Sequence, residues 1–267
     1  MTDNRNAALG GARTFTTIGM VGAGNMARAL ATGWATPILC TDNGSGRAAE
    51  LAADTGGVAV ATNAELGARA DVIVLCHKPG QLAAVGRELD GTQAVVVSVL
   101  SGVTSPQLDA VYRRSRAMRV TVNLPVRVRA GIVSLPTGQS VDAEVESAVA
   151  ALFGTVGTVV RIPEHQVDAL IPLAGVGPAL VAMFAQAQAD AAIHAGLPAS
   201  LARSLATETL RGTAALLAEF EHDTLALRRA VASPGGPTER ALAAAQAQGL
   251  PHAVLAAARA ALPKVTN

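Results

Sequence analysis

A glycine-rich turn near the start of the chain contains the first residues whose types and spacing predict chemistry. Residues 18–30 read IGMVGAGNMARAL, in which Gly22, Gly24 and Ala27 form the pattern G-x-G-x-x-A after an apolar run. The first glycine allows a tight turn, the second lets a pyrophosphate approach the backbone, and the alanine allows close packing of helix on strand. We therefore predict a dinucleotide site, with a purely structural turn as the alternative. Its candidate cofactor-binding residues are Gly22, Gly24, Asn25 and Met26.

Asp42 follows the second apolar run, where the adenosine ribose of a dinucleotide is bound. An acid there bonds the ribose hydroxyls and repels a 2′-phosphate, which favours NAD. Ser45 and Arg47 follow closely and could instead hold that phosphate, which favours NADP. These residues leave NAD and NADP undecided, and the Asp-Asn-Gly sequence is also typical of a simple turn.

His77, Lys78 and Pro79 end another apolar run. Ligands bind at the carboxyl ends of strands in open α/β sheets, so these three residues are also candidates for cofactor binding. The alternative is a solvated turn shaped by the proline. A lone histidine at this place does not make a catalytic acid.

A second unusual turn, ASPGGPTER, occupies residues 232–240. Proline is tolerated in the first turn of a helix and threonine or serine caps it, so the stretch predicts a helix start. A helix start does not by itself require two glycines and two prolines in one turn. The stretch is therefore also a candidate functional segment.

Short apolar runs alternate with helical patterns up to residue 163, which implies βαβ units and a parallel sheet. After that point the strand signal stops, and residues 165–262 are almost entirely helical in pattern. We predict an α/β Rossmann-type domain over residues 15–163 and an all-α domain over residues 164–267, preceded by a disordered lead, residues 1–14. The predicted strands are 16–22, 37–41, 58–61, 71–77, 93–100, 115–123, 131–138 and 158–163.

Composition narrows the function classes. Half of the residues are apolar, which supplies a large core, but only 2% are aromatic. A net charge of +1 and few aromatic side chains argue against a nucleic-acid partner. The two cysteines, Cys40 and Cys76, show no metal-ligand spacing. Neither a signal peptide nor a membrane span is indicated, so we expect a soluble cytoplasmic protein without a metal.

Taken together, these motifs resemble the pyrroline-5-carboxylate reductase family, in the right order from Thr17 to Leu262. The resemblance implies a Rossmann domain, a helical dimerisation domain and a homodimer, with higher assembly of dimers left open. It also implies hydride transfer to the C=N carbon of 1-pyrroline-5-carboxylate, giving L-proline. The resemblance slightly favours NADPH as the hydride donor over NADH, for which Asp42 argues. The segments that carry it are IGMVGAGNMARAL, CHKPGQL, VSVLSGVTSPQL, RVTVNLPVRVRAGI, EHQVD, LAGVGPALV and ASPGGPTERAL.

The resemblance also assigns roles to side chains. A protonated imine accepts hydride more readily, so one hydroxyl near the ring nitrogen suffices, and by resemblance it is Thr238. Ser233 and neighbouring backbone N–H groups at a helix start would hold the substrate carboxylate. The candidate substrate-binding residues are Ser233, Gly235, Gly236, Pro237, Val176, Leu180 and Asn123.

The chain departs from the family pattern inside these motifs. Pro237 stands where an N–H-bearing residue is usual, which removes a donor worth about 1.5–3 kcal/mol to a charged group. Val176 replaces a serine and Leu180 a tyrosine, while Thr121 and Val122 replace methionine and proline before Asn123.

These departures leave three interpretations open. The first is a proline-forming reductase with neutral changes. The second is a relative that acts on a bulkier or less polar cyclic imine in a specialised pathway. The third is a paralogue that binds nucleotide and dimerises but has little activity. Retention of Thr238 and of the glycine fingerprint argues against the third.

Overall fold

The computed structural model describes residues 14–262, so the predicted disordered lead, residues 1–14, falls outside this range except for its last residue. The chain divides into two compact units, Met1–Asp168 and Ala169–Asn267. The division comes slightly after the predicted boundary at 163/164. Glu164 bonds Ser105 and Arg119 of the first unit, and Val167 is buried, so this segment stays with that unit.

The first unit contains a six-stranded sheet of order β3-β2-β1-β4-β5-β6, in which every pairing is parallel. This order places the first βα turn and the end of β4 side by side at the point where the strand order reverses. The prediction of a Rossmann-type fold is confirmed. The strands are β1 (Ile18–Val21), β2 (Leu39–Thr41), β3 (Val58–Ala59), β4 (Val72–Leu75), β5 (Val95–Ser98) and β6 (Ala117–Arg119).

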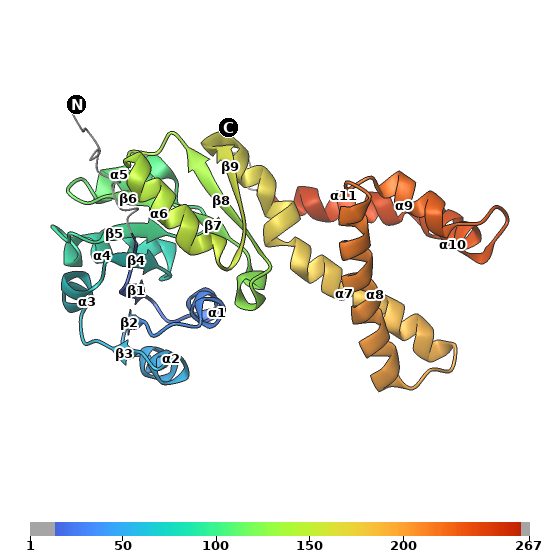
Figure 1. Ribbon diagram of the computed structural model, residues 1–267, viewed down its shortest axis with the longest axis horizontal. Helices are drawn as coiled ribbons and strands as arrows, with labels where there is room; N and C mark the ends of the chain where they lie inside the picture. The colour runs from blue at the N-terminus through green and yellow to red at the C-terminus, as the bar shows by residue number, and fades with distance from the viewer. Residues whose placement is uncertain (1–13, 263–267) are drawn as a thin grey trace, which may run out of the picture. The chain divides into compact units, whose positions relative to one another are not determined.

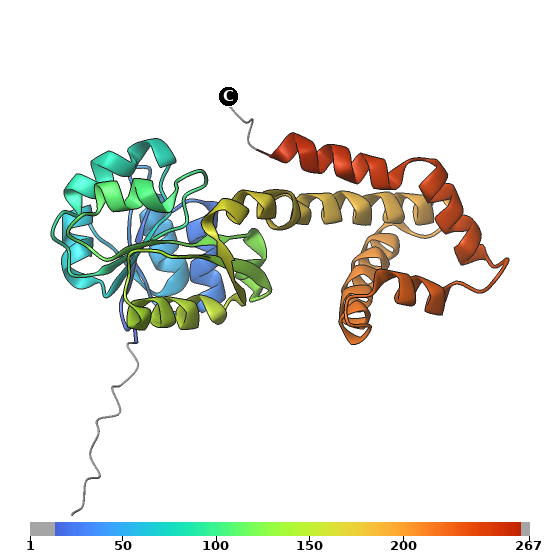
Figure 2. The same ribbon diagram turned by 90° about the horizontal axis from the view of Figure 1, so that it is seen from above.

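Helices cover both faces of this sheet (Figures 1 and 2). Alternate residues of β4 enter opposite cores: Val72 and Val74 join a cluster with α1, α2 and α6, whereas Ile73 and Leu75 join one with α3, α4 and α5. The helices of this unit are α1 (Asn25–Trp34), α2 (Arg47–Thr55), α3 (Asn63–Arg69), η1 (Pro79–Gln81), α4 (Leu82–Glu88), α5 (Ser105–Val111), η2 (Leu124–Val128), α6 (Ala143–Gly154) and η3 (Glu164–Leu170).

A second sheet of order β7-β8-β9 completes the first unit, from β7 (Thr121–Val122), β8 (Gly131–Thr137) and β9 (Gly157–Pro163). The prediction of one strand over 115–123 is wrong, because the chain changes sheets after Val120. The Val120 N–H still bonds Ser98 of β5, but Thr121 already pairs antiparallel with β8. The short turn through η2 makes that antiparallel pairing reachable.

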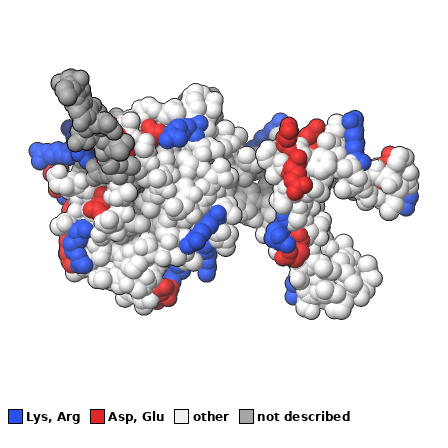
Figure 3. Space-filling model, viewed as in Figure 1, with Lys and Arg blue, Asp and Glu red and all other residues white. Residues whose placement is uncertain are grey.

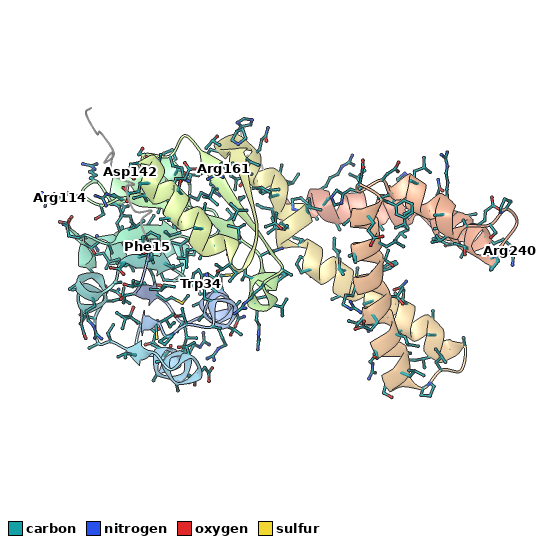
Figure 4. All side chains as sticks on the ribbon, viewed as in Figure 1. Phe15, Trp34, Arg114, Asp142, Arg161 and Arg240 are labelled. Atoms are coloured by element: carbon teal, nitrogen blue, oxygen red, sulfur yellow. The ribbon has the colours of Figure 1, made fainter. Side chains whose placement is uncertain are left out.

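Trp34 ties α1 to α6. Its ring lies edge-on to that of Phe153, with the centroids 5.3 Å apart, and its indole N–H donates to the Leu152 carbonyl. Figure 4 labels Trp34. This contact holds the helix that follows the two glycines of the fingerprint.

The second unit is entirely helical over its described residues, as predicted. Helices α7 and α8 pack together around buried Ala189, Ala202 and Ala206. The small side chains allow the two helices to approach closely. The elements are η4 (Ile171–Gly175), a π-helical turn, followed by α7 (Gly177–His194), α8 (Ala199–Glu219), α9 (Thr224–Val231), α10 (Pro237–Ala247) and α11 (Leu250–Ala261).

Many large apolar side chains of this unit remain exposed, among them Leu173, Met183 and Phe184. The continuous helical stretch Glu164–His194 is long and apolar enough to cross a membrane by length and composition, although the sequence did not indicate a span. A single stretch of this kind is weak evidence for a membrane, since other apolar helices pass the same test.

Candidate functional site

The glycine turn after β1 closes against the end of β4. Gly22 has a φ of +96°, and a Cβ there would lie 2.8 Å from the carbonyl carbon of Cys76 and the nitrogen of His77. The Gly22 N–H also donates to the Thr41 carbonyl at 2.9 Å. Both the backbone conformation and the close approach therefore require glycine at this position.

No neighbouring protein atom requires glycine at position 24. Gly24 is the N-cap of α1 without a side-chain cap, and a Cβ there would meet no protein atom within 4 Å. Beneath it, Ala27 is fully buried. The free space and the uncapped helix start fit a bound phosphate, because the first N–H groups of a helix lack intrahelical partners.

A cavity of about 380 Å³ opens beside this turn at the carboxyl ends of β1, β2 and β4. The fold thus brings together most of the residues predicted to bind the cofactor, over three separate sequence segments. Those that line the cavity are Gly22, Gly24, Asp42, Ser45, Arg47, His77 and Lys78. Asn25 and Pro79 begin α1 and η1 without lining it, and Met26 packs against the core.

Sequence analysis missed Asn63 and Glu88, which also line the cavity. The Asn63 side chain accepts from the Thr41 hydroxyl at 2.5 Å and donates to Glu88 at 2.6 Å. Asn63 begins α3, and three residues separate it from the end of the short strand β3. Its position at the carboxyl edge was therefore readable, whereas Glu88, at the end of α4, arrives there only through the fold.

Asp42 is engaged by its own turn. One carboxylate oxygen accepts from the Gly44 N–H, and the other accepts from the Ser45 hydroxyl and the Ala48 N–H, all at 2.8–3.0 Å. These hydrogen bonds, led by that from Ala48, lower the pKa of the Asp42 carboxyl. The carboxylate is thus charged and serves as an anchor for the start of α2.

Arg47 begins α2 on the cavity wall. Its guanidinium is exposed and makes no ion pair within residues 14–262. An exposed arginine next to the hydroxyl of Ser45 is a suitable partner for a phosphate, since the guanidinium fork matches phosphate geometry.

His77 lines the cavity. Burial lowers the pKa of its imidazole, although a hydrogen bond to the Lys78 carbonyl at 2.8 Å opposes the shift. A neutral imidazole with its proton held by the backbone positions the loop and gives no strong acid.

A larger cavity, about 540 Å³, lies at the opposite edge of the sheet, beside Asp71 and Ala94 at the amino ends of β4 and β5. Open α/β sheets bind ligands at the carboxyl edge, so the smaller cavity is the candidate cofactor site. Over residues 14–262 the fold gathers no group of three or more metal-ligating side chains.

The turn 232–240 begins a helix, as predicted. Gly236 is the N-cap of α10 and Pro237 occupies its first turn, while Gly235 adopts a φ of +70°. Pro237 therefore lacks an N–H at a position where no intrahelical partner would exist in any case. The Gly236 N–H donates to the Ser233 carbonyl at 2.9 Å. Ser233 is exposed and Thr238 half-buried.

Two residues that the sequence analysis did not single out hold this turn. The Gly235 N–H donates to a carboxylate oxygen of Glu239 at 2.5 Å, and the Arg240 guanidinium donates to the Gly235 carbonyl at 2.6 Å. Figure 4 labels Arg240 at the start of α10. A carboxylate and a guanidinium thus both bond the backbone of Gly235.

The other predicted substrate residues lie in two places. Val176 and Leu180 are half-buried where η4 gives way to α7. Asn123 is buried in the first unit, and its side-chain oxygen accepts from the Ile132 N–H at 2.7 Å. Asn123 thereby shapes the turn between β7 and β8.

Comparison with known proteins identifies the relatives of this chain. Residues 164–267 match the family described as pyrroline-5-carboxylate reductase dimerisation, and residues 17–102 match NADP oxidoreductase, coenzyme F420-dependent. A pyrroline-5-carboxylate reductase of Corynebacterium melassecola is 31% identical, over 92% of this chain and 96% of the relative. The chain belongs to the pyrroline-5-carboxylate reductase family.

Other members of the family give the same result. The pyrroline-5-carboxylate reductase of Arabidopsis thaliana is 34% identical, over 83% of this chain and 84% of its own. The solved structure of a pyrroline-5-carboxylate reductase from Coxiella burnetii is 30% identical, with a TM-score of 0.79 over 92% of this chain and 95% of its own. The family resemblance noted from the motifs is thus confirmed, and the chain is an NAD(P)-dependent oxidoreductase that carries a dimerisation domain.

Proposed function

We propose that this protein reduces 1-pyrroline-5-carboxylate to L-proline with a reduced nicotinamide cofactor. The observation that carries the proposal is the uncapped start of α1 beside a cavity at the carboxyl edge of the sheet, in a chain of this family. The free space over Gly24 fits a pyrophosphate. The bound nicotinamide supplies the hydride for the ring C=N carbon.

The protein's own part is to bind, orient and protonate the imine. Thr238 donates or relays a proton to the ring nitrogen, since protonation makes the imine a better hydride acceptor. Ser233 and the N–H groups at the start of α10 hold the substrate carboxylate. One hydride on carbon and one proton on nitrogen convert the imine to the amine.

We propose NADPH as the preferred cofactor, a choice that the sequence left open. Both carboxylate oxygens of Asp42 accept hydrogen bonds within its own turn. Arg47, in contrast, is exposed and lines the cavity together with Ser45. The positive charge of Arg47 would attract a 2′-phosphate and offset its repulsion by the Asp42 carboxylate.

We propose that two chains pair through their helical units. Only a few alanines form a buried cluster among the described residues of that unit, while many large apolar side chains stay exposed. Figure 3 shows broad uncharged surface between groups of charged residues there. An exposed apolar surface of this size is typical of an interaction site, and we propose that a second copy of the chain covers it. Pairing would also explain the apolar stretch Glu164–His194 without a membrane. We place the protein in the cytoplasm.

A second candidate function is reduction of a bulkier or less polar cyclic imine. It is favoured by Val176, Leu180 and Pro237, which replace hydroxyl-bearing or N–H-bearing residues of the family pattern. Each replacement removes a group that would hold a polar substrate.

The test is NADPH oxidation by the purified full-length protein with 1-pyrroline-5-carboxylate, with the six-membered homologue and with substituted cyclic imines. We expect the highest kcat/KM for the five-membered acid. A higher kcat/KM for a bulkier imine would favour the second candidate. Cofactor binding without oxidation with any imine would contradict both.

A further inference from the structure

The Glu239 carboxylate lies on the turn that we propose to hold the carboxylate of the substrate. It accepts the Gly235 N–H at 2.5 Å, within the motif 233–238. Glu239 is exposed in the first turn of α10, where a negative charge is stabilised by the helix dipole. The protein's own carboxylate thus occupies a donor of the kind that an incoming carboxylate needs.

The remaining donors of the turn are few. The Gly236 N–H is bonded to the Ser233 carbonyl, and Pro237 has none. At the three successive positions 235–237, an acid-bearing imine therefore meets one donor taken by an anion, one taken by the backbone and one that is absent. The N–H groups of Thr238 and Glu239, in the first turn of α10, remain for the substrate carboxylate. The charge of Glu239 also repels a second carboxylate at short range.

We propose that Glu239 is a specificity-determining residue that competes with the carboxylate of the substrate. Its side chain must release Gly235 before an acid-bearing imine binds fully, and this lowers the apparent affinity by the fraction of protein in the released state. An imine without a carboxylate does not face this competition. The inference rests on the proposed function, because it takes the turn 233–238 as the substrate-holding segment.

The experiment compares two substrates in four proteins. KM and kcat are measured at saturating NADPH for 1-pyrroline-5-carboxylate and for 1-pyrroline, the same ring without the carboxylate. The proteins are the wild type, Glu239→Ala, Glu239→Gln and the control Glu219→Gln. Glu219 is also exposed in the helical unit but ends a different helix, α8.

We expect Glu239→Ala to lower KM for the acid about fivefold or more, with KM for 1-pyrroline and both kcat values unchanged within about twofold. For Glu239→Gln, KM for the acid should fall between the values of the wild type and Glu239→Ala, because the neutral amide still accepts the Gly235 N–H but lacks the charge. Glu239→Gln also keeps the turn intact if the alanine variant folds poorly. Binding of L-proline with NADP⁺, measured by calorimetry, should tighten in the same order.

Other outcomes overturn the inference. An unchanged KM for the acid in both variants, an equal change for the two imines, or an equal effect of Glu219→Gln would each do so while leaving the proposed function in place. If the wild type oxidises NADPH with neither imine, the proposed function fails and this inference fails with it.

Discussion

At the residue scale, Thr238 occupies the second position of α10 and is half-buried, whereas Ser233 is exposed. Sequence analysis selected it through the family signature, and the structure adds that it follows an uncapped helix start. A single hydroxyl there can donate or relay the one proton that imine reduction requires.

We expect Thr238→Ala to lower kcat about 100-fold, because it removes the proton donor or relay, with little change in the Kd of NADPH. Thr238→Ser keeps the hydroxyl and should restore most of the activity. Steady-state kinetics and fluorescence titration of NADPH provide the two readouts. A kcat unchanged by the alanine variant would remove Thr238 from the mechanism.

The adenosine end of the cavity gives a second prediction at this scale. Arg47→Ala should raise KM for NADPH tenfold to a hundredfold, since a hydrogen bond to a charged group is worth about 1.5–3 kcal/mol, and should change KM for NADH little. Arg69→Ala is the matched control, because Arg69 pairs with Glu65 on the surface and does not line the cavity. Equal losses with the two cofactors would contradict a 2′-phosphate site.

At the element scale, one ion pair joins β6, α5 and η3. Buried Arg119 donates to Glu164 at 2.5 Å, and the same carboxylate accepts from the Ser105 hydroxyl at 2.9 Å and from its N–H at 3.2 Å. Burial by itself would raise the pKa of the Glu164 carboxyl, but the hydrogen bonds from Ser105 and Arg119 lower it. The network fixes the last segment of the first unit.

We expect Glu164→Gln to lower the free energy of unfolding by about 2 kcal/mol at pH 7, since it leaves the Arg119 charge without its partner. The folded pKa lies below the ordinary value of 4.5, so this stability is present above that pH and is lost as the pH falls through the folded pKa. Denaturant melts at pH 7 and at acid pH measure the difference between wild type and variant, which should shrink in acid.

The surface pair of Glu146 with Arg161 is the control for that prediction. Glu146→Gln should cost less than about 1 kcal/mol, because both side chains are solvated. An equal loss for the two variants, or a loss at Glu164 that does not depend on pH, would show that the network contributes no more than a surface pair.

At the scale of the whole molecule, the exposed apolar residues of the helical unit are the feature with the widest consequence. On α7, the Phe184 side chain is 42% exposed and that of neighbouring Met183 is 63% exposed. A monomer with this surface would be prone to associate, and closed pairing of two copies removes the surface from water.

We expect Phe184→Glu to raise the dimer Kd about a hundredfold or more, because the interface loses a buried aromatic side chain and gains a charge. Sedimentation velocity over a concentration series measures the shift. Val58→Glu places the same charge on an exposed apolar position of the first unit and should leave the dimer intact. A wild-type protein that sediments as a monomer at micromolar concentration would contradict the pairing.

The sequence by itself determined what local backbone chemistry can carry. The dinucleotide turn was predicted from the spacing of Gly22, Gly24 and Ala27. The parallel sheet was predicted from the alternation of apolar runs and helical patterns before residue 163. The ASPGGPTER motif predicted a helix start and contributed to the family resemblance of the chain. These signals are local, since each depends on conformations open to only a few residue types or on a short periodicity.

Tertiary structure decided what depends on partners far apart in the chain. The switch of sheets after Val120 and the arrival of Glu88 at the cavity follow from packing between distant segments. The hydrogen bonds that engage Asp42 are local, but they too depend on the exact geometry of the folded turn. The hydrogen bond from the Gly235 N–H to Glu239 was not predicted from the sequence either. A glutamate in the first turn of a helix is expected for its favourable interaction with the helix dipole alone. Residue types name the groups available for chemistry, and only the folded chain determines which of them are already bonded to one another.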